Sequence, residues 1–262
     1  MIPQINPEET KAQLIKFIQE QVENAHSSGV VIGLSGGIDS TIVAHLAVEA
    51  LDSENVLGIS IPSDTTPQED IKDARKLAKT LDIEFKEISL TKTMDALDET
   101  VDECTGLVGS YLALGNLQSR LRMAISYYFA NALNYLVIGT GNKSEIHYGY
   151  FTKYGDGGVD FLPLANLYKT QLWPLAEHLQ VDPNIIKKAP RAGLWGKQTD
   201  EKEMGIPYEQ LDKILYRIID KNETNETILF ELNTTETEIE KVRTQIKKSL
   251  HKNKTPTTPP IL

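Results

Sequence analysis

A glycine-rich turn between an apolar run and a helical pattern is the feature that most constrains this fold. Residues 30–34 read Val-Val-Ile-Gly-Leu, a short apolar run typical of a buried parallel strand. Residues 35–40 read Ser-Gly-Gly-Ile-Asp-Ser, and apolar residues then recur at helical spacing over 41–51. A strand, a tight turn and a helix in this order begin a parallel-sheet unit, whose ligands lie at the carboxyl ends of the strands. The turn therefore predicts an α/β fold with a ligand at 35–40.

Strand patterns and helix patterns alternate through the first half of the chain. This alternation is typical of a doubly wound parallel sheet and predicts a Rossmann-like α/β fold. After Thr140 the sequence predicts loops and helices alone. We therefore expect one domain over 1–262, with the sheet core at about 28–165 and a helical C-terminal appendage at about 166–262. The other strands are predicted at 56–61, 84–88 and 135–139, and the other helices at about 7–28, 67–81, 116–133 and 235–249, with 91–115 mostly helical around a loop at 106–109.

Composition limits the function. The 262 residues carry a formal net charge of −10, which disfavours a basic nucleic-acid-binding surface as the main function. Cys104 is the single cysteine, so a disulfide framework, a cysteine-rich zinc site and an iron–sulfur cluster within the chain are excluded. No stretch approaches the roughly 20 apolar residues that span a bilayer, and the N-terminus shows no signal-peptide pattern. We expect a cytoplasmic protein with no membrane and no nucleic-acid partner.

The residue types in the turn point to a polyphosphate ligand. Gly36 and Gly37 let backbone N–H groups approach an anion, and the helix N-terminus adds partial positive charge. Asp39 would repel a phosphate unless a divalent cation lay between them, so it predicts Mg²⁺. The turn matches neither GxxxxGK(S/T) nor GxGxxG, which disfavours a P-loop kinase and a dinucleotide dehydrogenase. A tight turn without any ligand is the plainer alternative.

Ser-Gly-Gly-x-Asp-Ser after a first parallel strand resembles the pyrophosphate loop of the N-type ATP pyrophosphatases, which have the adenine nucleotide alpha hydrolase-like fold. Members of that group cleave ATP between the α and β phosphates and adenylylate an oxygen of their substrate. The group includes NAD, GMP, asparagine and argininosuccinate synthetases and tRNA-thiolating enzymes. The motif alone implies the group and leaves the substrate open.

Three later segments narrow the resemblance to the NAD synthetases. Residues 116–123 read Asn-Leu-Gln-Ser-Arg-Leu-Arg-Met, residues 139–145 read Gly-Thr-Gly-Asn-Lys-Ser-Glu, and residues 149–160 contain Phe-Thr-Lys-Tyr-Gly-Asp-Gly. They are similar to the family patterns NxxxRxRM, GTx(N/D)xxE and GFFTKYGDGxxD. The resemblance covers nearly the whole chain and implies ATP-dependent amidation of deamido-NAD to NAD with ammonia. It implies an NAD-adenylate intermediate and the release of AMP and pyrophosphate.

The resemblance also implies roles for individual residues. Asp39 and Glu145 match the carboxylates that hold Mg²⁺, and Asp39, Lys153 and Asp160 are the candidate catalytic residues. The positions that match deamido-NAD contacts are Arg120, Lys153, Asp160, His251 and Lys252. The positions that match ATP contacts are Gly33, Leu34, Ser35, Gly36, Gly37, Ile38, Asp39, Ser40, Thr140, Lys169 and Arg191.

Arg191 departs from the family pattern. The family usually has Pro-Thr-Ala-Asp-Leu where residues 190–194 read Pro-Arg-Ala-Gly-Leu, so Arg191 replaces an ATP-contacting threonine and Gly193 replaces an acid. An arginine can still hold a phosphate through its fork of donors. His147 and Tyr150 also depart, at positions where the family more often has small residues or Phe.

The implied chemistry needs no protein nucleophile. Transfer of AMP to the nicotinate carboxylate makes a mixed anhydride, which ammonia attacks at the carbonyl carbon. The turn and Mg²⁺ would stabilise the departing pyrophosphate, and Asp160 is a candidate for assisting the loss of a proton from ammonium. A glutamine-hydrolysing domain would need roughly a hundred further residues. We therefore expect free ammonia, or ammonia from a separate protein, and the dimeric family implies a homodimer.

Plainer readings and other functions stay open at this point. Asp39 and Glu145 are also favourable as acids at helix starts, and Lys143 is as compatible with the surface as with a phosphate. Of the two arginines on one helix, we expect Arg120 to serve a ligand and Arg122 the fold. The alternative functions are another ATP pyrophosphatase, such as a tRNA-modifying enzyme, and a non-catalytic nucleotide sensor on the same fold. One cysteine and the net charge of −10 disfavour the former.

Overall fold

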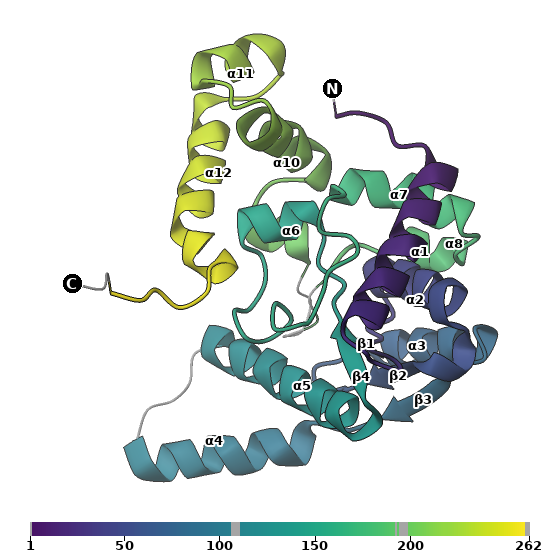
Figure 1. Ribbon diagram of the computed structural model, residues 1–262. Coiled ribbons are helices and arrows are strands. Elements are labelled where there is room, and N and C mark those ends of the chain that lie inside the picture. The colour runs from purple at the N-terminus through teal and green to yellow at the C-terminus, as the bar shows by residue number, and fades with distance from the viewer. Residues whose placement is uncertain (1, 106–110, 192, 194–198, 260–262) are drawn as a thin grey trace.

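The computed structural model describes residues 2–105, 111–191, 193 and 199–259 (Figure 1). The loop expected at 106–109 lies outside the described residues, as do the side chains of 102–105, which include Cys104. None of the described helices is long and apolar enough to cross a membrane.

A four-stranded parallel sheet forms the centre of the fold, as predicted. Its order is β3-β2-β1-β4, with Val31 of β1 aligned with Leu57 of β2 on one side and with Val137 of β4 on the other. The chain moves outward from β1 to β3 and then returns to the other side of β1, so the strand order reverses between β1 and β4. Ligands of open α/β sheets bind in the crevice at such a point. The strands are β1 (Gly29–Gly33), β2 (Val56–Ser60), β3 (Glu84–Glu87) and β4 (Tyr135–Ile138).

Helices cover both faces of the sheet (Figure 1). The strand residues alternate between the two apolar layers: Val30 and Ile32 of β1 face the α1, α2 and α7 side, whereas Val31 faces the α5 side. The doubly wound architecture is thus confirmed. The helices of the first layer are α1 (Pro7–Asn24), α2 (Ile38–Leu51), α3 (Gln68–Thr80), α7 (Lys169–His178) and the short α8 (Pro183–Ile186), and those of the second are α4 (Thr91–Thr105) and α5 (Tyr111–Leu133).

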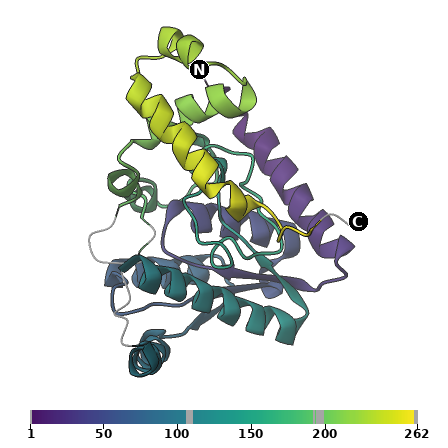
Figure 2. The same ribbon diagram turned by 90° about the vertical axis from the view of Figure 1, so that its left-hand side faces the viewer.

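The C-terminal helices pack together above the sheet layer, as Figure 2 shows. Their apolar residues form a cluster of their own around the fully buried Tyr208, with Leu211 and Ile239. The short helix α6 lies against this cluster and follows directly after β4. The helices are α6 (Lys143–Tyr148), α9 (Asp200–Met204), α10 (Tyr208–Leu215), a π-helical turn (Tyr216–Asp220), α11 (Asn225–Glu231) and α12 (Glu236–Ser249), and two 3-10 turns lie at Ser53–Asn55 and Leu250–Asn253.

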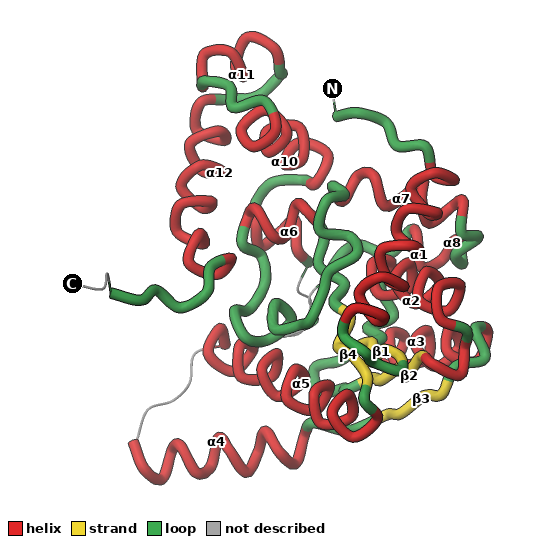
Figure 3. Tube along the Cα trace, viewed as in Figure 1, coloured by secondary structure: helices red, strands yellow, loops and turns green. Residues whose placement is uncertain are grey.

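Three predicted helix boundaries were wrong. The helix expected at 41–51 begins at Ile38, because Gly37 is its N-cap and Ile38, Asp39 and Ser40 form its first turn. The helix expected at 116–133 begins at Tyr111, and the first helix ends at Asn24 rather than next to Gly29. The region after Thr140 is helical and looped as predicted, apart from one isolated bridge between Ile138 and Phe161. Figure 3 shows the long loop that joins α6 to α7 across the carboxyl end of the sheet.

Candidate active site

The turn after β1 is folded tightly by its own serines and glycines. Gly36 has a φ of +73°, and a Cβ added there would lie 2.4 Å from the carbonyl oxygen of Asp70, so the position requires glycine. Oγ of Ser40 lies 3.0 Å from Oγ of Ser35, and the N–H of Gly37 donates to Ser35 at 3.3 Å. No side chain caps the start of α2, so the N–H groups of its first turn have no partner within the helix. These donors can bind an anion.

Asp39, in the first turn of α2, lies at the centre of the site. Nζ of Lys169 donates to Oδ1 of Asp39 at 2.6 Å, and Nδ2 of Asn142 donates to Oδ2 at 2.8 Å. Nζ of Lys169 also lies 3.8 Å from Oε1 of Glu145. The fold therefore brings together three sequence-predicted residues, Asp39, Glu145 and Lys169, that lie far apart in the sequence.

A capping box fixes Glu145. Asn142 is the N-cap of α6: its Oδ1 accepts from the N–H of Glu145 at 3.0 Å, and Oε2 of Glu145 accepts from the N–H of Asn142 at 3.2 Å. Because the fully buried Asn142 also contacts Asp39, one side chain positions both carboxylates. The sequence prediction missed this role of Asn142, although an Asn three residues before a Glu is a capping pattern.

The cluster holds its charges away from water. Burial and the charge of Asp39 raise the pKa of Glu145 well above its usual value, and Lys169 opposes that shift. Burial alone would lower the pKa of Lys169, but the charges of Asp39 and Glu145 outweigh it and raise the pKa. Lys169 is therefore an ammonium ion at neutral pH and compensates for the two carboxylates.

Asp200 and Tyr208 lie behind Lys169, and neither was predicted as a site residue. The hydroxyl of Tyr208 donates to Oδ2 of Asp200 at 3.2 Å, and its ring centroid lies 5.4 Å from Nζ of Lys169. Burial raises the pKa of Asp200, and the charge of Lys169 opposes the shift. An acid at the start of a short helix was the signal in the sequence, but nothing there indicated that this helix reaches the sheet.

Asp70 of α3 holds two cations beside the turn. Arg191 forms two hydrogen bonds with it, Nε at 3.1 Å from Oδ2 and Nη2 at 2.6 Å from Oδ1. Nζ of Lys188 donates to Oδ1 of Asp70 at 2.9 Å, to Asp73, and to the carbonyl oxygen of Gly36 at 3.2 Å. Lys188 was not predicted. Arg191 is thus held beside the turn by its ion pair with Asp70. Its contact with ATP stays a prediction.

Three of the residues predicted for deamido-NAD meet where the C-terminus crosses the loop after α6. Nζ of Lys153 donates to the carbonyl oxygen of His251 at 2.8 Å. Nζ of Lys252 donates to the carbonyl oxygens of Gly149 and Phe151, both at 2.7 Å. Burial lowers the pKa of Lys252, which Asp156 opposes. The two lysines concentrate positive charge beside this loop, and their contact with deamido-NAD stays a prediction.

The remaining predicted residues for deamido-NAD lie along α5 and the end of the loop. Arg122 donates from Nε to the carbonyl oxygen of Ile61 at 3.0 Å, whereas Arg120 is exposed and forms no ion pair with the described residues. Arg122 thus contacts the fold as expected, and the contact of Arg120 with a ligand stays a prediction. Asp160 accepts from the N–H of Val137 at 2.7 Å and from the hydroxyl of Tyr127 at 3.1 Å. Since both oxygens have donors from the fold, its assistance to ammonia stays a prediction.

Two other predicted positions have clear surroundings. Thr140 is half-buried and lies just after β4. Because β4 pairs with β1, this places Thr140 at the same edge of the sheet as the turn after β1. Lys143 does not point freely to solvent: its Nζ lies 2.5 Å from Oδ1 of Asp220, in the π-helical turn, and 4.6 Å from the ring centroid of Tyr168. Lys143 therefore joins α6 to the C-terminal helices.

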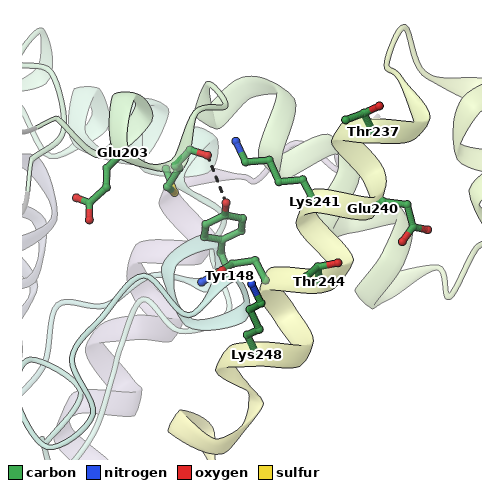
Figure 4. Close-up of a pocket in the computed structure, with 9 residues that line it drawn as sticks. Tyr148, Glu203, Thr237, Glu240, Lys241, Thr244 and Lys248 are labelled. Carbon is green, nitrogen blue, oxygen red and sulfur yellow. Dashed lines mark hydrogen bonds between the residues drawn. The ribbon is translucent and has the colours of Figure 1, made fainter. Parts of the chain in front are cut away.

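A separate groove of ≈ 530 Å³ lies between α12 and the α6–α9 side (Figure 4). Tyr148 points into it and donates to the carbonyl oxygen of Met204 at 3.4 Å, while Lys241 and Lys248 extend from α12. None of the predicted site residues lines this groove. The candidate active site is therefore the cluster around Asp39 at the carboxyl end of the sheet.

Comparison with known proteins decides the family. The family model described as NAD synthase matches residues 10–256. This chain belongs to the NAD synthase family. An NH(3)-dependent NAD(+) synthetase from Methanococcoides burtonii is 44% identical over 248 residues, covering 95% of this chain and 93% of that protein.

Two solved structures of the family extend the likeness to three dimensions. The structure of NMN synthetase from Francisella tularensis has a TM-score of 0.86 at 36% identity and covers 98% of this chain and 100% of that one. The NH3-dependent NAD synthetase from Campylobacter jejuni, in complex with the nitrate ion, has a TM-score of 0.81 at 32% identity, with coverage of 98% and 100%. The predicted Rossmann-like fold and the resemblance to NAD synthetases are confirmed.

Proposed function

We propose that this chain amidates deamido-NAD to NAD with ATP and ammonia, through an adenylylated intermediate, and releases AMP and pyrophosphate. The observation that carries the proposal is the position of Asp39, which lies in the first turn of α2 beside Lys169 and Glu145. Backbone donors, an ammonium group and paired carboxylates around one helix start suit a metal-bound polyphosphate. The name of the Methanococcoides burtonii relative supports ammonia as the nitrogen donor.

The residues present fit a magnesium ion. Asp39 and Glu145 supply carboxylate oxygens, and Mg²⁺ is usually held by one or two carboxylates together with phosphate oxygens and waters. Within the described part of the chain, no group of three or more His, Cys, Asp or Glu side chains could hold a metal on its own. A magnesium ion at this site would therefore take its remaining ligands from the phosphates and water. When bound, the ion would neutralise charge on the phosphates and orient them.

The chain's own residues supply the rest of the chemistry. The N–H groups at the start of α2 would bind the pyrophosphate oxygens as charge develops on them. Lys169 adds a positive charge that burial keeps from being screened by water. We assign Lys153 and Lys252 to the phosphates of the dinucleotide and Arg120 to the same ligand. No side chain needs to act as a nucleophile.

The size of the substrate is a second question, raised by the likeness to the structure of an NMN synthetase. An enzyme of that kind would amidate the mononucleotide acid instead of the dinucleotide. Lys153, His251 and Lys252 lie together beyond the ATP turn, and this separate set of contacts favours the larger substrate.

One assay tests these alternatives. The protein is incubated with ATP, Mg²⁺ and ammonium, together with either deamido-NAD or the mononucleotide acid, and AMP and amide product are followed. We expect equal amounts of AMP and NAD, and none with Asp39→Asn. Binding of ATP without either product would indicate a sensor, and preference for the mononucleotide would overturn the dinucleotide assignment. Glutamine in place of ammonium tests the nitrogen donor, and we expect it to support little synthesis.

We also propose a homodimer formed through α5. Tyr111 and Leu112 at its start are 81% and 61% exposed, and Tyr128 further along is 72% exposed. Large side chains exposed along one helix are typical of a surface that a partner covers. Arg120 and the Tyr127–Asp160 pair lie on or against the same helix, so a partner there would border the dinucleotide site. Light scattering of Tyr128→Glu against the natural protein tests this, with a monomer as the expected result for the variant. The cytoplasmic location and a separate supplier of ammonia stay predictions.

A further inference from the structure

The N-terminal ends of α6 and α7 meet at one buried carboxylate, Asp212 of α10. Asp212 is fully buried. Its Oδ1 accepts from the hydroxyl of Ser144 at 2.5 Å, and its Oδ2 accepts from the N–H of Thr170 at 2.9 Å. Oγ of Ser144 in turn accepts from the N–H of Lys169 at 2.9 Å. The two N–H groups belong to the first two residues of α7 and have no partner within that helix.

This network is adjacent in sequence to both residues that face Asp39. Ser144 directly precedes Glu145, and Thr170 directly follows Lys169. The first turn of α7 is therefore held by a side chain from the C-terminal helices, directly at Thr170 and through Ser144 at Lys169. Ser144 also ties Asp212 to the residue before Glu145, and among the described residues Asp212 forms no hydrogen bond with Asp39 or Glu145.

Packing alone does not account for an acid at this position. Leu211, Ile214 and Leu215 on the same helix are fully buried in the apolar cluster, and acids are rarely buried among such residues without a partner. Burial raises the pKa of Asp212, which the hydrogen bonds from Ser144 and Thr170 oppose. The charge of Lys169 also opposes the shift, but no ion pair to Asp212 is found among the described residues, and a buried carboxylate without one is costly for folding.

We propose that Asp212 is a positioning residue, which sets the placement of Glu145 and Lys169 around Asp39 and thereby the binding of ATP with its divalent cation. The inference rests on the proposed function. It assigns the C-terminal helical part a direct role in the nucleotide site. Outer hydrogen-bond partners of this kind change metal affinity or activity by about tenfold to a hundredfold when removed.

The test uses two variants in the network and one control on the same helix. Asp212→Asn keeps the size but cannot accept two hydrogen bonds on separate oxygens, and Ser144→Ala removes the shared hydroxyl. Ile214→Ala is the control, because Ile214 is equally buried in α10 and belongs to the apolar cluster. Thermal unfolding, KM and kcat for ATP at several Mg²⁺ concentrations, and KM for deamido-NAD are measured for each full-length variant.

We expect both network variants to raise KM for ATP about tenfold or more and to need more Mg²⁺, with KM for deamido-NAD little changed. Ile214→Ala should lower the unfolding temperature and leave KM for ATP as it was. The double variant should raise KM for ATP no more than the stronger single variant does, since the two residues act through one chain of hydrogen bonds.

The inference would be overturned if Asp212→Asn and Ser144→Ala lost stability but still bound MgATP as well as Ile214→Ala does. If Asp212→Asn does not fold, Ser144→Ala decides alone. A natural protein that forms no NAD would instead refute the proposed function, and direct titration of MgATP would still show whether Asp212 positions the nucleotide site.

Discussion

Nζ of Lys169 lies 2.6 Å from Oδ1 of Asp39, on the carboxylate that we assign to magnesium. The side chains are only 4% and 13% exposed, so water screens this pair weakly. Glu145, whose pKa is raised, shares the same ammonium group at 3.8 Å. In the nucleotide-free protein, Lys169 therefore provides the positive charge that two half-buried carboxylates need, and the cation of MgATP adds to it or displaces it.

Lys169→Met tests that relationship, because methionine keeps much of the length and removes the charge. We expect NAD formation to fall about a hundredfold or more, because the variant loses a buried positive charge beside the proposed phosphate site. We also expect Mn²⁺ to bind the nucleotide-free variant more tightly, since Asp39 and Glu145 then lack their counter-charge. Electron paramagnetic resonance of free Mn²⁺ measures this directly. Lys16→Met, at a side chain that is 76% exposed, is the control, and an Mn²⁺ affinity that does not rise in Lys169→Met would contradict the idea.

The pH dependence of stability should change when Glu145 is replaced by glutamine. Because the folded-state pKa of Glu145 lies above its ordinary value of 4.5, the folded protein binds this proton more tightly than the unfolded chain. The Glu145 contribution to the free energy of unfolding therefore falls as pH rises from 4.5 through the raised pKa. Each unit between the two pKa values corresponds to about 1.4 kcal/mol.

Thermal unfolding without metal or nucleotide measures this effect. Relative to the natural protein, Glu145→Gln should gain stability as pH rises through that range and level off above it. Glu209→Gln, at an exposed acid of α10, should show no such trend. A difference between Glu145→Gln and the natural protein that stays constant with pH would sink the prediction.

Gly33, at the end of β1, and Gly36, inside the turn, should respond differently to substitution by alanine. Gly36→Ala meets the carbonyl oxygen of Asp70 at 2.4 Å and has a φ of +73°, which alone costs an alanine about 1–2 kcal/mol. Gly33→Ala has no protein atom within 4 Å of the added Cβ, so it should fold normally. It should still raise KM for ATP if the ligand fills that space. Unfolding curves and KM for ATP separate the two effects, and a destabilised Gly33→Ala would show that the open space has another use.

The sheet and the turn were predictable because each depends on local sequence. An apolar run such as 30–34 followed by Ser-Gly-Gly leaves little choice other than a buried strand and a tight turn, and both were found. Asp39 was identified as a metal ligand from its place in that turn, and Glu145 from the motif resemblance. The motif resemblance then predicted that Lys169, more than a hundred residues after Asp39, contacts ATP in the same site.

The residues that were missed act through distant packing. Asp212 and Asp200 lie on helices whose local patterns show only some buried positions, and Lys188 lies just after the short helix α8. Their partners are set by how the C-terminal helices pack on α6 and how the chain after α8 passes α3. Helical periodicity says which face is buried but not which helix covers it. Arg191 shows the same limit, since its predicted partner was ATP and its partner in the fold is Asp70.

Replacing Asp70 should reduce stability and ATP binding more than replacing either of the two cations that it holds. Its side chain is 9% exposed and accepts from Lys188 and Arg191, and Lys188 continues to the carbonyl oxygen of Gly36. Asp70→Asn removes the negative charge that both cations share, and Lys188 keeps only Asp73 and the carbonyl oxygen of Gly36 as partners. We therefore expect KM for ATP to rise several-fold and the free energy of unfolding to fall by about 3 kcal/mol. Arg191→Met removes one ion pair, whose arginine side chain is 30% exposed. It should lower the free energy of unfolding by no more than about 1 kcal/mol. Steady-state kinetics and urea unfolding give both quantities. If Arg191→Met raises KM for ATP as much as Asp70→Asn while leaving stability unchanged, then Arg191 contacts the nucleotide itself, as its sequence position predicted, and the ion pair with Asp70 is the state from which it is released.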